Sequence, residues 1–175
     1  MDLPIYDRFA AGLHSLTAAL VIVLILLGLG AEPLRDRIDE FAMLMLHKWL
    51  GMTVFVLTLA RLAWRIGHPP PPLPDTTPAW QRSAAHLVHW VFYAFLLGLP
   101  VLGYLLSSGG PYPLNWFGLI DVPKAPVTKS LADAAHRAHV VGGITMAVLV
   151  LVHVCAALWH QFVQRDRLLA RMRIG

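Results

Sequence analysis

Four long apolar segments follow one another along the sequence, at roughly 9–29, 41–64, 84–107 and 134–163. Each reaches the ~20 residues that a helix needs to cross a bilayer. None alternates apolar and polar residues with the period of two that a membrane-spanning strand shows. Because backbone groups in lipid must pair within their own segment, the pattern predicts an all-α fold of four transmembrane helices.

The segments between the apolar stretches have the composition of loops. Residues 31–40 are short and acidic, 67–78 contain a run of prolines, and 109–126 are rich in glycine and proline. Proline lacks the N–H that a helix interior needs, so the helices are expected to end there. The first apolar segment is longer than the hydrophobic part of a signal peptide, so we expect it to remain as a span. Residues 1–175 are therefore expected to form a single integral membrane domain.

Composition supports a membrane protein and excludes several other classes. Hydrophobic residues make up 57% of the chain and charged residues 14%, whereas soluble domains have about 25% charged residues. The single cysteine, Cys155, excludes a disulfide-stapled domain and is expected to be a packed core thiol. Basic residues gather at the ends of the apolar segments and form no stripe with aromatics, so lipid and not nucleic acid is the expected partner.

The charges of the loops predict the orientation, because cytoplasmic loops carry an excess of Lys and Arg. The side that holds both termini has eight basic residues and the other side has six, with acidic residues divided four to six. The first set is Arg8, Arg61, Arg65, Arg82, Arg165, Arg167, Arg171 and Arg173; the second is Arg35, Arg37, Lys48, Lys124, Lys129 and Arg137. Both termini are therefore expected in the cytoplasm.

Nine histidines are present, and several fall inside the predicted spans, where an ionisable residue is a functional hypothesis by default. His139 and His153 lie 14 residues apart, which places them on one helix face about 21 Å from each other. Since successive helices alternate in direction, His47 shares the outer half of the membrane with His139, and His14 shares the inner half with His153. Two such bis-imidazole sites suit two b-type haems closed to other ligands.

His160 is an alternative partner for His14. It lies seven residues beyond His153, about 20° away on the same face, and its distance from flanking arginines matches the depth of His14 better. However, His139 and His160 would be about 31 Å apart, as far as the whole hydrocarbon core is thick. A lone membrane histidine is also often only a hydrogen-bonded bundle residue.

With these residues in place, the chain resembles the bacterial cytochrome b561 family of small di-haem membrane cytochromes. The motifs that carry the resemblance cover nearly the whole chain: Arg8 with His14; Leu46-His47; Arg61-Leu62 to Arg65 before the proline run; His86-Leu87-Val88-His89 with Tyr93, Pro100 and Gly103; Asn115-Trp116-Phe117-Gly118; and His139, His153 and His160. The chain departs from the family pattern at Ser15, where tryptophan is usual, and at Lys48, where an apolar residue is usual.

The resemblance implies a function and a set of site residues. The axial ligands of two b haems would be His14, His47, His139 and His153, in a bacterial inner-membrane protein. The implied activity is electron transfer linked to the quinone pool, and in one branch superoxide is oxidised at the outer haem while ubiquinone is reduced. The chain is then either such a superoxide:ubiquinone oxidoreductase or an electron-transfer cytochrome without that activity.

Other polar residues receive secondary hypotheses. Arg8, Arg61 and His160 are candidate partners of the inner haem propionates. His86 and His89 are candidates for a quinone site or a proton path. Four basic residues lie near the outer site and would attract an anion such as superoxide: Lys48, Lys124, Lys129 and Arg137.

Two competing functions follow from the same features. The chain could be a haem b membrane anchor that passes electrons between a partner dehydrogenase and quinone, which predicts a protein that co-purifies with it. It could also be a histidine-lined metal transporter without haem, but the spans carry almost no acidic residues to neutralise a cation.

Overall fold

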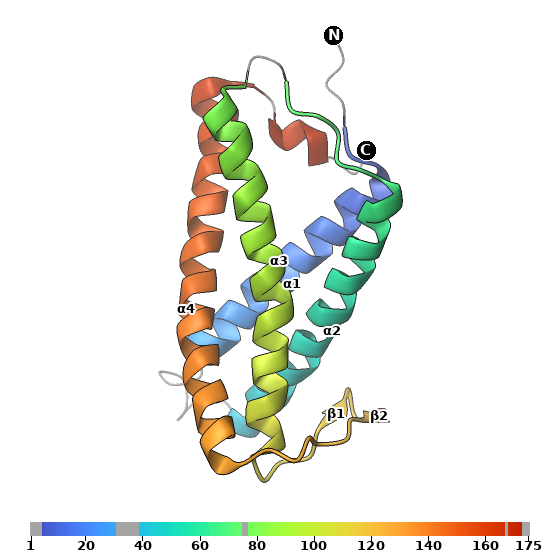
Figure 1. The fold of residues 1–175 in the computed structure, drawn as a ribbon, viewed down its shortest axis with the longest axis vertical. Helices are drawn as coiled ribbons and strands as arrows, with labels where there is room; N and C mark the ends of the chain where they lie inside the picture. Colours follow the sequence, from blue (N-terminus) through green and yellow to red (C-terminus); the bar gives the residue numbers. More distant parts are fainter. Residues whose placement is uncertain (1–4, 31–38, 75–76, 167, 173–175) are drawn as a thin grey trace.

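The computed structural model describes residues 5–30, 39–74, 77–166 and 168–172, and its four long helices confirm the predicted architecture. They are α1 (Arg8–Gly30), α2 (Glu40–Gly67), α3 (Ala79–Ser108) and α4 (Lys129–Trp159), running alternately up and down (Figure 1). All four are long and apolar enough to cross a membrane. Each helix begins and ends within five residues of its predicted bounds. The predicted end of the fourth span, residue 163, falls in a π-helix that follows α4.

One buried residue from each helix meets in the middle of the bundle. Val21, Val54, Leu96 and Met146 form this core, which we call the middle layer. Helices α3 and α4 pack closely because Gly142 has no side chain, since a Cβ atom there would lie 2.8 Å from Leu99 Cδ2. The middle layer thus fixes the four helices to one another at mid-height.

The outer surface of the helices is apolar, as expected for a face in contact with lipid. Leu26, Val141 and Leu151 are each more than 60% exposed. Cys155 is exposed as well, so its prediction as a packed core thiol is wrong. It lies two residues beyond His153, which turns it about 160° away from the bundle interior and toward lipid.

Segment 109–126 contains a short β-hairpin that the sequence did not predict. β1 (Asn115–Trp116) pairs antiparallel with β2 (Ile120–Asp121). Phe117 and Gly118 both have positive φ, and the Leu119 N–H closes the turn on the Trp116 carbonyl. Two indole hydrogen bonds fasten the hairpin to α2: Trp49 Nε1 donates to Asn115 Oδ1, and Trp116 Nε1 donates to Thr53 Oγ1, both at 3.1 Å.

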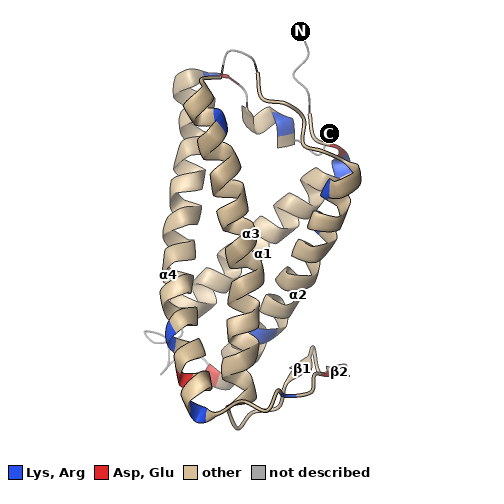
Figure 2. Ribbon diagram, in the orientation of Figure 1, with Lys and Arg blue, Asp and Glu red and all other residues tan. Residues whose placement is uncertain are grey.

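The two ends of the described chain lie together at the opposite end of the bundle. After α4 come a π-helix (His160–Gln164) and a 3-10 helix (Leu168–Met172). Arg171 is 4% exposed and donates to the carbonyls of Pro71 and Pro72, at 2.7 and 2.9 Å. The Tyr6 N–H donates to the Arg171 carbonyl. Both ends therefore sit on one side of the predicted membrane, and charged residues concentrate toward the two ends of the bundle (Figure 2).

Asp7 stabilises the start of α1 through its carboxylate. Asp7 Oδ1 accepts from the Ala10 N–H at 2.8 Å, and both carboxylate oxygens accept from Trp64 Nε1 at 3.2 Å. The Ala10 hydrogen bond holds the pKa of Asp7 below its usual value. A carboxylate with a depressed pKa stabilises the fold above its unfolded-state pKa, and that stability is lost as the pH falls through the folded-state value.

We therefore expect Asp7→Ala to lower the Tm of the detergent-solubilised protein at pH 7. The deficit should shrink as the pH is lowered below about 4. Thermal unfolding at both pH values measures this, with Asp133→Ala, an exposed aspartate on α4, as the control. An equal deficit at both pH values would contradict the role of the charge.

Candidate functional site

The polar side chains inside the bundle follow a seven-residue repeat on all four helices. Seven residues advance an α-helix by about 10.5 Å and turn it by only about 20° from its starting direction, so residues with this spacing form stacked layers. The repeats, each with its middle-layer residue at the centre, are His14–Val21–Gly28 on α1, His47–Val54–Arg61 on α2, His89–Leu96–Gly103 on α3 and His139–Met146–His153 on α4.

The outer layer consists of His47, His139, Gly28 and Gly103. The rings of His47 and His139 face each other with centroids 6.0 Å apart and an angle of 71° between their planes. His139 Nδ1 lies 2.9 Å from the Leu99 carbonyl and must donate to it, which leaves Nε2 with a free lone pair. The buried His47 Nδ1 has no hydrogen-bond partner among the described residues.

The two glycines of the outer layer leave room beside the histidine rings. A Cβ atom on Gly103 would lie 3.3 Å from His139 Cε1, and one on Gly28 would lie 3.5 Å from His47 Cε1. Two helices therefore contribute an imidazole each, and the other two contribute no side chain at this depth. This arrangement suits a flat group that needs two axial nitrogen ligands.

The inner layer consists of His14, His89, His153 and Arg61. The rings of His89 and His153 have centroids 6.4 Å apart, and His14 interacts electrostatically with both of them and with Arg61. His14 and His153 thus lie at the same depth, and His89 joins them there. One turn along α1 from His14, Thr17 Oγ1 is buried without a hydrogen-bond partner among the described residues.

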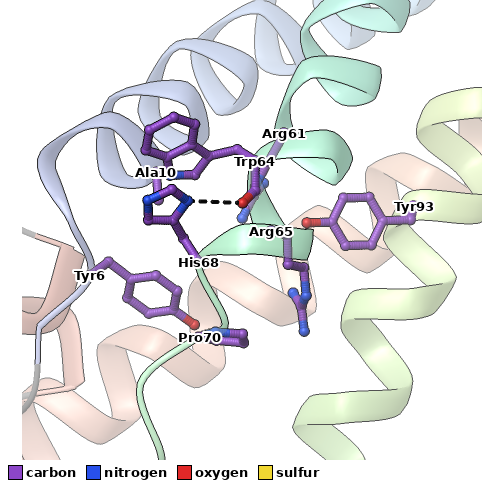
Figure 3. A pocket seen from close by; sticks show the side chains of 8 residues that line it. All are labelled: Tyr6, Ala10, Arg61, Trp64, Arg65, His68, Pro70 and Tyr93. Atoms are coloured by element: carbon purple, nitrogen blue, oxygen red, sulfur yellow. Dashed lines mark hydrogen bonds between the residues drawn. The ribbon is translucent and has the colours of Figure 1, made fainter.

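Arg61 belongs to the inner layer and also lines a small pocket. The pocket has a volume of about 30 Å³, and its lining includes Tyr6, Arg61, Arg65, His68 and Tyr93 (Figure 3). The guanidinium carbons of Arg61 and Arg65 lie 5.7 and 5.8 Å from the centre of the Tyr93 ring. These two cations can bind an acidic group between them.

Arg8 and His160, the other two predicted partners of the propionates, lie outside the inner layer. Arg8 is exposed at the start of α1. His160 is the first residue of the π-helix, and its Nδ1 is hydrogen-bonded to Asp166 Oδ2 at 2.5 Å. The left-handed backbone of Arg165, with φ 56°, turns the chain so that Asp166 meets His160. The two side chains form an imidazole–carboxylate pair at the inner end of the bundle.

The donor set fits b-type haem better than a bare metal ion. Within the described ranges, no group of three or more His, Cys, Asp or Glu side chains converges as a bare ion would require. A six-coordinate haem needs only two imidazoles from the protein, because its macrocycle supplies four ligands. The facing rings of the outer layer, its two glycines and the buried His47 Nδ1 all fit such a group.

Fold and site together define a class of protein: a membrane-bound electron-transfer protein whose helices present half-buried histidines in layers at two depths. The chain belongs to the prokaryotic cytochrome b561 family, whose model matches residues 5–175. The haem and the redox character of the chain follow from this membership.

Individual relatives agree with the family assignment. The chain is 33% identical to cytochrome b561 homolog 2 of Escherichia coli (strain K12), over 95% of this chain and 90% of the relative. It is 28% identical to the probable superoxide oxidase CybB of Yersinia pestis, over 95% and 94%. It is 30% identical to cytochrome b562 of Cereibacter sphaeroides, over 97% and 95%.

Three features of the site were not predicted from the sequence. The proximity of His89 to His153 and the place of Gly28 beside His47 both follow from the seven-residue repeat, which is visible in the sequence once all four helices are aligned on it. No sequence pattern indicated Asp166, because its contact with His160 depends on the π-helix and on the turn at Arg165.

Proposed function

We propose that this chain carries electrons across the bacterial inner membrane through two b haems, from superoxide at the outer end to ubiquinone at the inner end. The observation that carries the proposal is the pair of histidine layers on either side of the apolar middle layer. The family membership supports haem, and the similarity to the Yersinia relative, a probable superoxide oxidase, supports superoxide as the donor.

In this proposal His47 and His139 would hold the outer haem, and His14 and His153 would hold the inner haem. The rings of His89 and His153 are 6.4 Å apart, about as far as those of the outer pair, so ring separation alone does not select the partner of His153. Helix α3 packs extensively against α4, which favours a ligand from another helix. Helix α1 shares few contacts with α4, so a flat group fits more easily between His14 and His153. Each haem, when bound, passes single electrons by alternating between ferric and ferrous iron.

The protein's own residues then orient and separate the two sites. The Leu99 carbonyl fixes the ring of His139 and keeps its Nε2 free to ligate. Arg61 would pair with a propionate of the inner haem, since it is half-buried and interacts electrostatically with His14. With two imidazoles at each site, the protein would leave no position open to dioxygen.

The inner end offers groups for the protons that quinone reduction consumes. Ubiquinone takes up two electrons and two protons to become ubiquinol, so two superoxide ions are oxidised for each quinone. The hydrogen bond between His160 Nδ1 and Asp166 Oδ2 holds a proton at this end, two helical turns from His153. With Nδ1–H donated to Asp166, His160 Nε2 carries the lone pair that would take up a proton from the cytoplasmic side. The Asp166 carboxylate would stabilise the resulting imidazolium, and the Nε2 proton would then pass to a quinone oxygen.

The proposal is tested by spectroscopy and rapid kinetics on the purified protein. We expect two b haems per chain, a sharp reduced α band and no spectral change with carbon monoxide. Superoxide should reduce the haems in stopped flow, and added ubiquinone should reoxidise them. Absence of haem would overturn the proposal, and haems that superoxide leaves oxidised would refute superoxide as the donor. A dehydrogenase that co-purifies and reduces the haems would favour the membrane anchor instead.

Two exposed cations on α4, Lys129 and Arg137, should speed the approach of superoxide to the outer end. Removing both charges with Lys129→Gln and Arg137→Gln should slow the bimolecular reduction of the haems by superoxide up to about tenfold at low salt. The difference should vanish at high ionic strength, where such fields are screened. Arg82→Gln, at the opposite end, is the matched control, and an equal loss in that variant would refute steering.

A further inference from the structure

A second cavity opens at the outer end of the bundle, on the side of α2 that faces away from the histidines. Its volume is about 340 Å³, and its lining residues are Phe41, Ala42, Met45, Trp49, Pro113, Asn115 and Gly118. Two residues along an α-helix turn the side-chain direction by about 200°, so Met45 and His47 lie on opposite faces of α2. The cavity is therefore separate from the outer haem site proposed above.

The wall of this cavity is apolar, and its polar groups are largely occupied. Trp49 Nε1, the only polar atom of that side chain, donates to Asn115 Oδ1 at 3.1 Å. The same Asn115 oxygen accepts from the Gly118 N–H at 3.0 Å. Ordered water needs two to four polar partners, and the lining offers few. An apolar chain is the occupant that this wall would favour.

Two lysines lie near the cavity without lining it. Phe41, in the lining, packs against the ring of Tyr112 with centroids 5.4 Å apart, and Lys48 Nζ lies 5.8 Å above that same ring. Lys48 also interacts electrostatically with Lys124, whose Nζ donates to the Gly110 carbonyl. Within the described parts of the chain, neither lysine is paired with a carboxylate. Two positive charges side by side favour an anion between them.

We propose that this cavity is a binding site for one anionic phospholipid of the outer leaflet. One acyl chain would lie along Phe41, Met45 and Trp49, which follow α2 from its outer end toward the membrane interior. The phosphate would lie between Lys48 and Lys124. Helical side chains lean toward the N-terminus of their helix, so Lys48 reaches back to the headgroup level from a deeper position. The indole-bonded hairpin forms the fixed outer wall of the site.

The experiment compares two lipids with the same acyl chains, phosphatidylglycerol and phosphatidylcholine, on the haem-loaded protein in detergent. Native mass spectrometry should show one phosphatidylglycerol bound per chain, about 30-fold more tightly than phosphatidylcholine, as two nearby lysines would provide. Equal affinity for the two lipids, or no retained lipid, would overturn the proposal.

Two variants separate the tail from the headgroup. Ala42→Phe places a ring in the cavity and should abolish binding of both lipids at this site, whereas Ala60→Phe, exposed near the other end of α2, should not. The double variant Lys48→Gln and Lys124→Gln should bring the phosphatidylglycerol affinity down to that of phosphatidylcholine. Unchanged lipid binding in either variant would refute the site. Haem spectra of each variant report on folding, and the haem content and superoxide kinetics of Ala42→Phe should match the wild type.

Discussion

His139→Ala is expected to remove the outer haem and reduce superoxide-dependent quinone reduction to the uncatalysed background. The ring of His139 faces His47 across the outer layer at 6.0 Å and is fixed by the Leu99 carbonyl. No other described histidine has a ring contact with either member of this pair. Haem per chain should fall from about two to about one, measured by pyridine haemochrome, and His47→Ala should have the same effect.

His136→Ala is the matched control for this prediction. His136 lies one turn earlier on α4 and is exposed, outside the outer layer. It should retain both haems and the wild-type rate. An outer haem that survives the loss of His139 with an unchanged reduced spectrum would show that the ligand assignment is wrong.

His14→Ala and His89→Ala should differ sharply, although both residues belong to the inner layer. The packing of α3 against α4 and the sparse contact of α1 with α4 favour His14 as the partner of His153. We expect His14→Ala to lose the inner haem, so that superoxide still reduces the remaining haem but electrons do not reach quinone. His89→Ala should keep two haems, with the spectrum of the inner one perturbed by the lost neighbour of His153.

The opposite result would reassign the ligand. If His89→Ala loses a haem and His14→Ala retains two, the inner site lies between α3 and α4. His153→Ala, which removes the residue common to both assignments, should lose the inner haem in either case. Retention of two bis-histidine haems by the His153 variant would contradict the inner layer as a haem site altogether.

The sequence was sufficient to predict the helices and the depth of the histidines. Twenty or more apolar residues in lipid have one favourable conformation, so the spans follow from composition alone. The alternation of helix direction then places His47 with His139, and the observed ring contact confirms that proximity. The likeness of the chain to its family was equally visible in the residues, and the comparison over residues 5–175 confirms it.

Features that depend on contacts between helices were not predictable in the same way. The exposure of Cys155 was missed because a packed thiol and a lipid-facing thiol have the same sequence environment. The hairpin at Asn115–Asp121 depends on the positive φ angles of Phe117 and Gly118 and on indole bonds to a helix more than 60 residues away. The π-helix that brings His160 to Asp166 likewise has no short sequence signature.

The middle layer has a consequence for the energetics of the living cell. Val21, Val54, Leu96 and Met146 offer no group that could relay a proton, so an electron that crosses this layer moves as uncompensated charge. In the proposed orientation the electron travels toward the negative interior of an energised bacterium. Moving one electron across the whole membrane against this potential costs about 2.3 kcal/mol for every 100 mV. Turnover should therefore slow as the membrane becomes energised and quicken as it is discharged, which would make the voltage itself a regulator of the reaction.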